Sequence, residues 1–262
     1  MSKDNLNGTN NLISTGSRIL VTGASGGIGE ALVKLLCNFS CKIGFHSMRS
    51  AIPENLVRYA ETNGTLLEKI SGNFLNSSDS HDAIHRFCSL WGGIDALVQL
   101  HGDANSKQFY DLKDKDWDEA LKINLISPFF LAQTAMKEMR NNSAGGRIVL
   151  TSTASAKHGG GINTIPYGTA KAGIECLVKM LAKIGAKDNI LVNAVAPGFI
   201  NTSFHSKRLE RSQEQLEKRK KIIPLNRAGT PVEVAQTILF LLSPTSGFIT
   251  GQTIEISGGD WL

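Results

Sequence analysis

Short apolar segments alternate along the chain with stretches whose apolar residues recur every three or four positions. The first pattern predicts strands and the second predicts amphipathic helices. We expect strands at 18–22, 41–45, 65–70, 94–100, 146–151, 190–195 and 253–256. We expect helices at 27–38, 54–62, 80–90, 116–140, 166–186 and 231–242. Asp79 is the expected cap of the third helix, and Pro128 should bend the fourth. This alternation indicates an α/β fold, with a parallel sheet covered by helices on both faces.

The 262 residues read as one domain, because no linker, repeat or low-complexity block interrupts residues 17–262. Residues 1–16 are polar, lack the apolar core of a secretory signal, and predict a flexible tail. The longest purely apolar run, 238–242, is far shorter than the about 20 residues of a membrane span, so we expect no membrane contact.

Cysteine and charge narrow the function classes further. The cysteines at 37, 41, 88 and 176 show no C-x-x-C spacing. We expect buried, reduced thiols in a cytoplasmic protein, and no metal site. The net charge is +5, and residues 205–221 hold seven basic residues and three Glu. The basic bias therefore belongs to one segment, which argues against a nucleic-acid partner. That segment is either a solvated mobile helix or a lid that attracts an anionic substrate.

A glycine-rich turn, Thr22-Gly23-Ala24-Ser25-Gly26-Gly27-Ile28-Gly29, follows the first strand and opens the first helix. In this context glycines permit a sharp turn and a close approach of backbone to a pyrophosphate. The helix N-terminus adds free N–H groups and a positive dipole end. A plain structural turn is the alternative interpretation. The residues predicted to bind a dinucleotide here are Gly23, Ser25, Gly26, Gly27, Ile28 and Gly29.

The spacing T-G-x-x-x-G-x-G resembles the short-chain dehydrogenase/reductase family, in its compact branch. The resemblance implies a single Rossmann-type, doubly wound sheet of seven parallel strands in the order 3-2-1-4-5-6-7. It also implies a nicotinamide dinucleotide cofactor. An acid at the end of the second strand would favour NAD, but this chain has Ser47 and Arg49 there. A hydroxyl and a guanidinium suit a 2′-phosphate, so NADP(H) is favoured over NAD(H) unless Arg49 simply faces solvent.

Tyr167 and Lys171 match the family's Y-x-x-x-K motif after the fifth strand. Residues four apart share a helix face, and a nearby ammonium would lower the pKa of the phenol. Tyr167 can then exchange a proton with a carbonyl or an alcohol. In relatives the lysine also bonds the nicotinamide ribose. A helical tyrosine beside a solvated lysine is the alternative.

Three more residues complete the catalytic set that the resemblance implies. The family places a Ser after the fifth strand, and here Thr153 fills that position, with Ser152 as the second choice. Either hydroxyl could hold the substrate oxygen, although neighbouring strand residues face opposite sides. Asn124 matches the Asn of the long fourth helix, which in relatives helps to hold a water linked to the lysine.

Further cofactor contacts follow from the resemblance: Asn73 and Phe74 at the adenine, Gly102 beside the cofactor, and Pro197, Gly198, Ile200 and Thr202 near the nicotinamide. One stretch departs from the family. Relatives read Asn-Asn-Ala-Gly where this chain reads Gln99-Leu100-His101-Gly102. The Asn that braces the central sheet in relatives is therefore missing, and His101 is larger than the usual Ala.

Two functions remain open at this point. The first is an NADP(H)-dependent oxidoreductase that moves a hydride between nicotinamide C4 and a carbonyl or secondary alcohol. Residues 223–231 are most similar to 3-oxoacyl-carrier-protein reductases, so an acyl thioester is one candidate substrate. The second is a non-catalytic dinucleotide-binding sensor or structural subunit, which the altered residues 99–101 and 153 motivate. The resemblance also implies a substrate lid near 203–222 and a homo-tetramer or dimer.

Overall fold

The computed structural model describes residues 12–142, 144–204 and 212–260. Their core is one parallel sheet in the order β3-β2-β1-β4-β5-β6-β7. The strands are β1 Arg18–Thr22, β2 Lys42–His46, β3 Leu66–Ile70, β4 Ala96–Gln99, β5 Gly146–Thr151, β6 Ile190–Pro197 and β7 Thr253–Ile256. The predicted fold class and strand order are confirmed.

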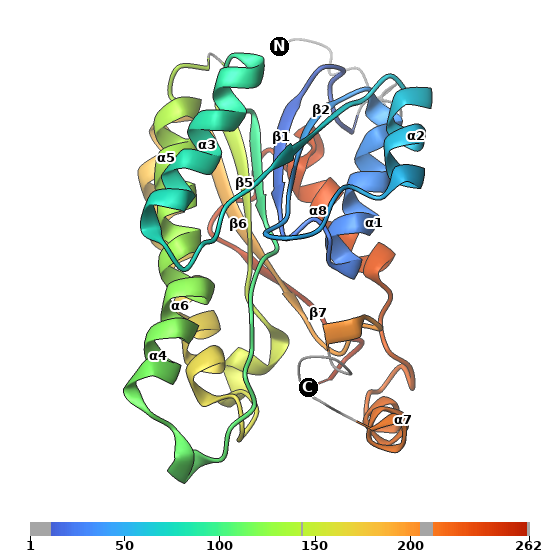
Figure 1. The fold of residues 1–262 in the computed structure, drawn as a ribbon, viewed down its shortest axis with the longest axis vertical. Helices are drawn as coiled ribbons and strands as arrows, with labels where there is room; N and C mark the ends of the chain where they lie inside the picture. The colour runs from blue at the N-terminus through green and yellow to red at the C-terminus, as the bar shows by residue number, and fades with distance from the viewer. Residues whose placement is uncertain (1–11, 143, 205–211, 261–262) are drawn as a thin grey trace.

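Helices cover both faces of this sheet, as Figure 1 shows. The helices are α1 Gly27–Leu36, α2 Glu54–Thr62, α3 Ser77–Trp91, α4 Asp114–Leu121, α5 Ser127–Met139, α6 Ile165–Gly185, α7 Gln213–Lys221 and α8 Pro231–Leu242. On one face α1, α2 and α8 enclose an apolar cluster that includes Val21, Val98 and Val195. On the other face α3, α5 and α6 enclose a second cluster that includes Leu20 and Leu97. Successive strand residues thus serve opposite cores, as the pleat requires.

The long helix predicted at 116–140 is interrupted. A π-helical turn, Lys122–Ile126, separates α4 from α5, and Pro128 lies in the first turn of α5 rather than at a bend. The Asn124 side-chain amide donates to the Ala120 carbonyl at 3.0 Å and competes with the backbone there. In this turn the Ser127 N–H donates to the carbonyl of Lys122, five residues earlier, which is the π-helical pattern. Side chains that bond the carbonyl four residues back compete with the helical backbone bond and often bend helices.

Three smaller predictions also need correction. Asp79 does not cap α3, which begins at Ser77; its carboxylate instead accepts the Asn73 N–H at 2.6 Å. The core extends into the segment predicted as a tail, since Ile13 is buried among apolar side chains. Residues 1–11 lie outside the described residues. Cys176 is exposed and Cys88 half-buried, so only Cys37 and Cys41 are the buried thiols expected of all four.

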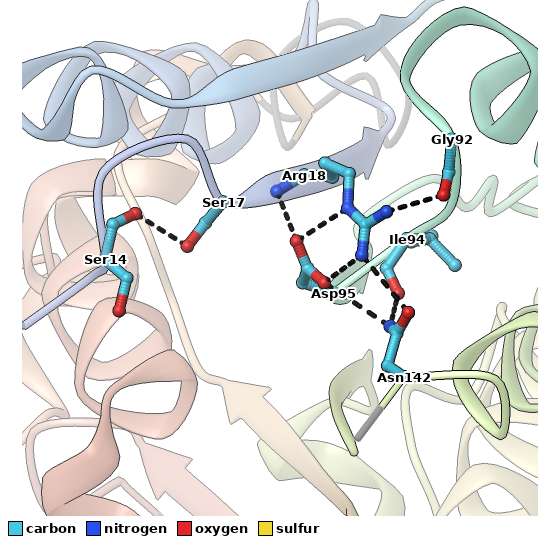
Figure 2. Close-up of polar contacts among 7 residues, drawn as sticks. All are labelled: Ser14, Ser17, Arg18, Gly92, Ile94, Asp95 and Asn142. Carbon is cyan, nitrogen blue, oxygen red and sulfur yellow. Dashed lines mark hydrogen bonds and ion pairs between the residues drawn. The ribbon is translucent and has the colours of Figure 1, made fainter. Parts of the chain in front are cut away.

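At the amino-terminal end of β1, a network of charged and polar side chains joins segments that are distant in the sequence. The Arg18 guanidinium donates to the Asp95 carboxylate at 2.9 and 2.6 Å, and also to the Gly92 carbonyl at 2.7 Å (Figure 2). Asn142, from the connection between α5 and β5, donates to the Ile94 carbonyl at 2.7 Å (Figure 2). The pKa of Arg18 is raised, chiefly by its hydrogen bond to Asp95. The network therefore ties the start of β1 to the segment before β4.

We expect Asp95→Asn to lower the free energy of unfolding by roughly 2 kcal/mol, because it leaves the Arg18 guanidinium without its carboxylate. Urea denaturation measures this difference. The matched control is Glu54→Gln, which breaks an exposed pair with Arg58 in which the two side chains are 90% and 76% exposed. That control should change stability by less than about 0.5 kcal/mol. Equal losses in the two variants would contradict the role assigned to the network.

Candidate functional site

A cavity of about 700 Å³ opens at the carboxyl ends of the central strands. In Figure 1 this is the lower end of the sheet, near β7 and α7. Parallel α/β sheets bind ligands at this edge. The cavity brings together most residues that the sequence singled out. Its lining includes Gly23, Ser25, Gly26, Gly27, Ile28, Gly29, Ser47, Asn73, Phe74, Gly102, Ser152, Thr153, Tyr167, Lys171, Pro197, Gly198, Ile200 and Thr202. Two predicted residues, Arg49 and Asn124, do not line it.

The glycine-rich turn forms one wall of the cavity. Gly23 has a φ of +66°, and a Cβ there would lie 2.5 Å from the His101 backbone nitrogen. A Cβ on Gly29 would collide with the Gly23 carbonyl, so close packing of α1 on the strand end needs glycine. The N–H groups of Gly27, Ile28 and Gly29 begin α1 and have no acceptor within the helix. A backbone cradle with a positive helix end fits a pyrophosphate.

The end of β2 carries Ser47 and Arg49, the two residues predicted to bind a 2′-phosphate. Ser47 is buried, and its hydroxyl donates to the Ser50 carbonyl, so it holds the turn together. Arg49 lies on that turn and is exposed. Residues 46–50 contain no carboxylate. Phe74 is buried and stacks on His46, with ring centroids 4.1 Å apart. This part of the cavity therefore offers an aromatic wall, while the exposed Arg49 lies on the adjoining turn, outside the cavity lining.

Tyr167 stands in the first turn of α6 and is partly exposed to the cavity. Burial raises the pKa of its phenol to about 12, while a hydrogen bond with Thr153 acts in the opposite direction. The sequence predicted the reverse, a pKa lowered by Lys171. The reason for the difference is that desolvation penalises the phenolate more than its neighbours stabilise it. At neutral pH Tyr167 is consequently a proton donor.

Lys171 lies one turn further along α6 and is buried. Its ammonium nitrogen donates to the Thr151 carbonyl at 2.8 Å and lies 5.8 Å from the centroid of the Tyr167 ring. Burial lowers the pKa of Lys171 to about 7. Because the amine titrates near neutrality, it can accept or release a proton in the physiological range. The predicted pair on one helix face is therefore present.

The two hydroxyls after β5 point in different directions. The strand ends at Thr151, and the Ser152 hydroxyl then donates to the Lys171 carbonyl at 3.0 Å and to Glu175 Oε1 at 3.1 Å. The Thr153 hydroxyl lies beside Tyr167 and 3.2 Å from the Ser155 hydroxyl. The structure thus places Thr153, the first choice of the sequence analysis, next to the tyrosine.

Asn124 is fully buried behind the cavity wall in the π-helical turn. Its side chain accepts from the Asp103 N–H at 3.1 Å and donates to the Asp103 carbonyl at 2.8 Å. A Cβ on Gly102 would lie 2.8 Å from Asn124 Oδ1 and 3.3 Å from Lys171 Nζ. Asn124 therefore fixes the segment that passes over the lysine.

The missing brace of the central sheet is supplied by Gln99. Its side-chain oxygen accepts the Thr151 N–H at 3.2 Å, and its amide donates to the His101 carbonyl. The Thr151 hydroxyl donates in turn to the Gln99 carbonyl. The altered motif was expected to weaken the bracing of the central sheet, and this expectation is wrong, because Gln99 and Thr151 bond each other across β4 and β5. The longer glutamine reaches both β5 and the loop beyond β4.

The loop after β6 closes the cavity on the side of the glycine-rich turn. A Cβ on Gly27 would lie 3.0 Å from Thr202 Cγ2, so the turn and this loop are in contact. Ile200 forms a bridge with Gly229, which anchors the loop to the segment before α8. The residues predicted to contact the nicotinamide therefore line the same cavity as the glycine-rich turn.

Two ion pairs in the cavity wall were missed by sequence reasoning. Arg219 of α7 makes a bidentate pair with Asp260, one bond of which measures 3.0 Å. Lys107 pairs with Asp116 at 2.6 Å. Neither separation, 41 residues for Arg219 and Asp260 and nine for Lys107 and Asp116, is one at which a helix or strand brings side chains together, and only the predicted lid near 203–222 pointed to Arg219. Of that lid, residues 205–211 lie outside the described part of the chain.

No helix among the described residues is long and apolar enough to cross a membrane. No group of three or more His, Cys, Asp or Glu side chains within residues 12–142, 144–204 and 212–260 could hold a metal ion.

Comparison with known proteins gives concordant matches. A family model described as enoyl-(acyl carrier protein) reductase matches residues 23–260. A 3-oxoacyl-[acyl-carrier-protein] reductase of Aquifex aeolicus is 35% identical over 92% of this chain and 95% of its own length. Nodulation protein G of Rhizobium sp. strain N33 is 34% identical over 94% and 97%. A solved short-chain dehydrogenase/reductase from Serratia marcescens covers 94% of this chain and 98% of its own at 27% identity, with a TM-score of 0.84.

Proposed function

We propose a function from the premise that the chain belongs to the short-chain dehydrogenase/reductase family and is an oxidoreductase enzyme. The proposed reaction is reduction of a carbonyl group by NADPH, with Tyr167 as the proton donor. The observation that carries the proposal is that one cavity is lined both by the glycine-rich cradle and by Tyr167, Thr153 and Lys171.

The residues of the cavity fit a nicotinamide dinucleotide. The N-terminus of α1 would hold the pyrophosphate, and Phe74 and Asn73 would border the adenine. Ile200 and Thr202 would meet the nicotinamide, and Lys171 its ribose. When bound, the cofactor supplies the hydride. The protein's task is to orient the carbonyl beside it and to provide the proton.

The proton would come from Tyr167 because its raised pKa keeps the phenol protonated at neutral pH. Thr153, hydrogen-bonded with Tyr167, would hold the carbonyl oxygen within reach of the phenol. Lys171, with its pKa of about 7, would pass a proton back toward the tyrosine. Asn124 would keep Lys171 in place through the segment at Gly102. Ser152 would support α6, since its hydroxyl contacts Lys171 and Glu175.

The preference for NADP(H) is supported by the end of β2. An exposed guanidinium at Arg49 and the absence of a carboxylate at 46–50 suit a 2′-phosphate. Ser47 would contribute by shaping the turn through its bond to the Ser50 carbonyl. The substrate that we propose is a 3-oxoacyl thioester, the substrate class in the name of the Aquifex aeolicus relative.

The proposal also covers assembly and location. Met180 and Ile184 are 52% and 57% exposed on α6, which is compatible with the expected homo-tetramer or dimer. All four cysteines are free in the structure, which agrees with a cytoplasmic compartment. Light scattering of the purified protein would measure the assembly.

Fluorescence titration with NADPH and NADH, followed by turnover of acetoacetyl thioesters and a panel of ketones, tests the proposed function. We expect tighter binding of NADPH and its oxidation by at least one carbonyl compound. Binding without turnover on any carbonyl would favour the alternative, a non-catalytic sensor or structural subunit. Tighter binding of NADH would overturn the cofactor assignment.

We expect Arg49→Gln to raise the Kd of NADPH roughly tenfold, because one charge-assisted bond to the 2′-phosphate is lost. The Kd of NADH should stay within about threefold, since that cofactor has no phosphate there. Arg58→Gln, an exposed arginine on α2, is the matched control and should change neither constant. Equal losses for the two cofactors in the Arg49 variant would contradict the assignment.

A further inference from the structure

His101, the residue that departs most in size from the family pattern, is buried between two parts of the site. Both of its ring nitrogens have partners. Nδ1 lies 2.8 Å from the Thr22 hydroxyl, at the end of β1, and Nε2 lies 2.9 Å from the Ser127 hydroxyl, at the start of α5. The ring also contacts Phe74, with centroids 4.6 Å apart. The imidazole thus spans the space between the glycine-rich turn and the interrupted helix.

The bonding pattern selects one tautomer. The Ser127 hydroxyl donates to the Ile123 carbonyl at 3.1 Å, so it has no proton left for the histidine and must accept from Nε2–H. Nδ1 is then the acceptor for the Thr22 hydroxyl. Burial holds the pKa of His101 well below its usual range, which agrees with a neutral ring. The bonds form a directed series, Thr22 to His101 to Ser127 to Ile123.

Each end of this series reaches a functional element. At one end Thr22 immediately precedes Gly23, whose position is set against the backbone of His101. At the other end the Ile123 carbonyl belongs to the π-helical turn that carries Asn124. That turn has an irregular backbone, so it depends on side-chain bonds to keep its shape.

We propose that His101 is a positioning residue that fixes the π-helical turn, and with it Asn124 and Lys171, relative to the cofactor cradle through Ser127. This inference rests on the proposed function for its catalytic consequence. It goes beyond that function because it gives a role to His101, which stands where the family pattern has Ala. Where the family pattern has the small Ala, the imidazole of this chain adds a hydrogen-bonded link between Thr22 and Ser127.

Three single variants and one double variant separate the link from simple packing. His101→Gln keeps a donor near the place of Nε2, whereas His101→Asn keeps an acceptor near Nδ1 and loses the reach to Ser127. Ser127→Ala removes the link from the other side with the loss of one oxygen. The double variant of His101→Asn with Ser127→Ala completes a cycle.

We expect kcat to fall about tenfold in His101→Asn and in Ser127→Ala, with the KM for NADPH changed less than threefold. His101→Gln should stay within about threefold of the wild type. The double variant should be no worse than either single variant, because both remove the same link. Wild-type kcat in His101→Asn, or losses that multiply in the double variant, would overturn the proposal.

Amide hydrogen exchange of the cofactor-free proteins gives a second readout that needs no substrate. Exchange of residues 123–127 should speed up about tenfold in His101→Asn and Ser127→Ala, but not in His101→Gln. Unchanged exchange in the first two variants would overturn the link. A wild-type protein that reduces no carbonyl would instead overturn the proposed function, while the exchange data would still decide whether His101 fixes the turn.

Discussion

Tyr167→Phe is expected to lower kcat for carbonyl reduction roughly a thousandfold, which is the size of effect that a positioned proton donor contributes. The ring remains in the first turn of α6, so the cavity keeps its shape. The Kd of NADPH should stay within about threefold, because the phenolic hydroxyl is not part of the proposed pyrophosphate cradle at residues 23–29. Steady-state kinetics and fluorescence titration of the same preparation measure the two quantities.

Tyr110→Phe is the matched control, since Tyr110 is 94% exposed and removal of its hydroxyl should leave kcat unchanged. Thr153→Val tests the neighbour of Tyr167 independently. We expect a loss of roughly a hundredfold in kcat from loss of the bond that would hold the carbonyl oxygen. If Tyr167→Phe retained more than a tenth of wild-type turnover, the assignment of the proton donor would be wrong.

The raised pKa of Tyr167 bears on the direction of the reaction. A phenol whose pKa is about 12 donates a proton at neutral pH but is a poor base. Reduction of a carbonyl needs the donor, whereas oxidation of an alcohol needs the base. The protonated phenol thus suits the proposed role of Tyr167 as the proton donor in carbonyl reduction.

The positions of the strands and of the glycine-rich turn could be predicted from the sequence because both are encoded locally. Buried strands of a parallel sheet read as short apolar runs, and a dinucleotide turn needs glycines at fixed offsets. Tyr167 and Lys171 could be paired for the same reason, since a separation of four residues places both side chains on one helix face. The family resemblance then supplied the strand order, which the structure confirms.

Other features depend on contacts between distant residues and could not be predicted. Gln99 braces the sheet by bonding Thr151, which lies 52 positions away in the sequence. The π-helical turn arises from a side-chain bond of Asn124 that competes with the backbone. The pKa of Tyr167 follows from burial, which no short motif determines. The hydrogen-bond partners of the two hydroxyls at 152 and 153 could not be predicted either, since the first contacts Lys171 and Glu175 and the second contacts Ser155.

The burial of Lys171 implies that the site is maintained at the expense of stability. Its ammonium is desolvated, and its pKa falls from 10.5 to about 7. Each pKa unit between the folded and unfolded states corresponds to about 1.4 kcal/mol. The hydrogen bond to the Thr151 carbonyl recovers part of this cost. A side chain of similar length without a charge would remove the cost and the function together.

Lys171→Met should therefore stabilise the cofactor-free protein by roughly 2 kcal/mol at pH 7 and lower kcat at least about a hundredfold. The pH dependence has a definite sign. Between pH 7 and 10.5 the unfolded lysine binds a proton that the folded one has lost, so wild-type stability gains with rising pH from this group. The advantage of the variant is complete well below pH 7, begins to shrink near pH 7 and falls further as the pH rises toward 10.5.

Urea denaturation of both proteins at pH 6, 7, 8 and 9 measures this difference, and groups common to the two proteins cancel in the comparison. Lys183→Met is the matched control, because Lys183 is exposed on the same helix and should alter neither stability nor kcat appreciably. A stability difference that did not change between pH 7 and 9 would mean that Lys171 does not titrate near neutrality in the folded state. The lysine would then be charged throughout this range, and its proposed part in returning a proton to Tyr167 would have to be withdrawn.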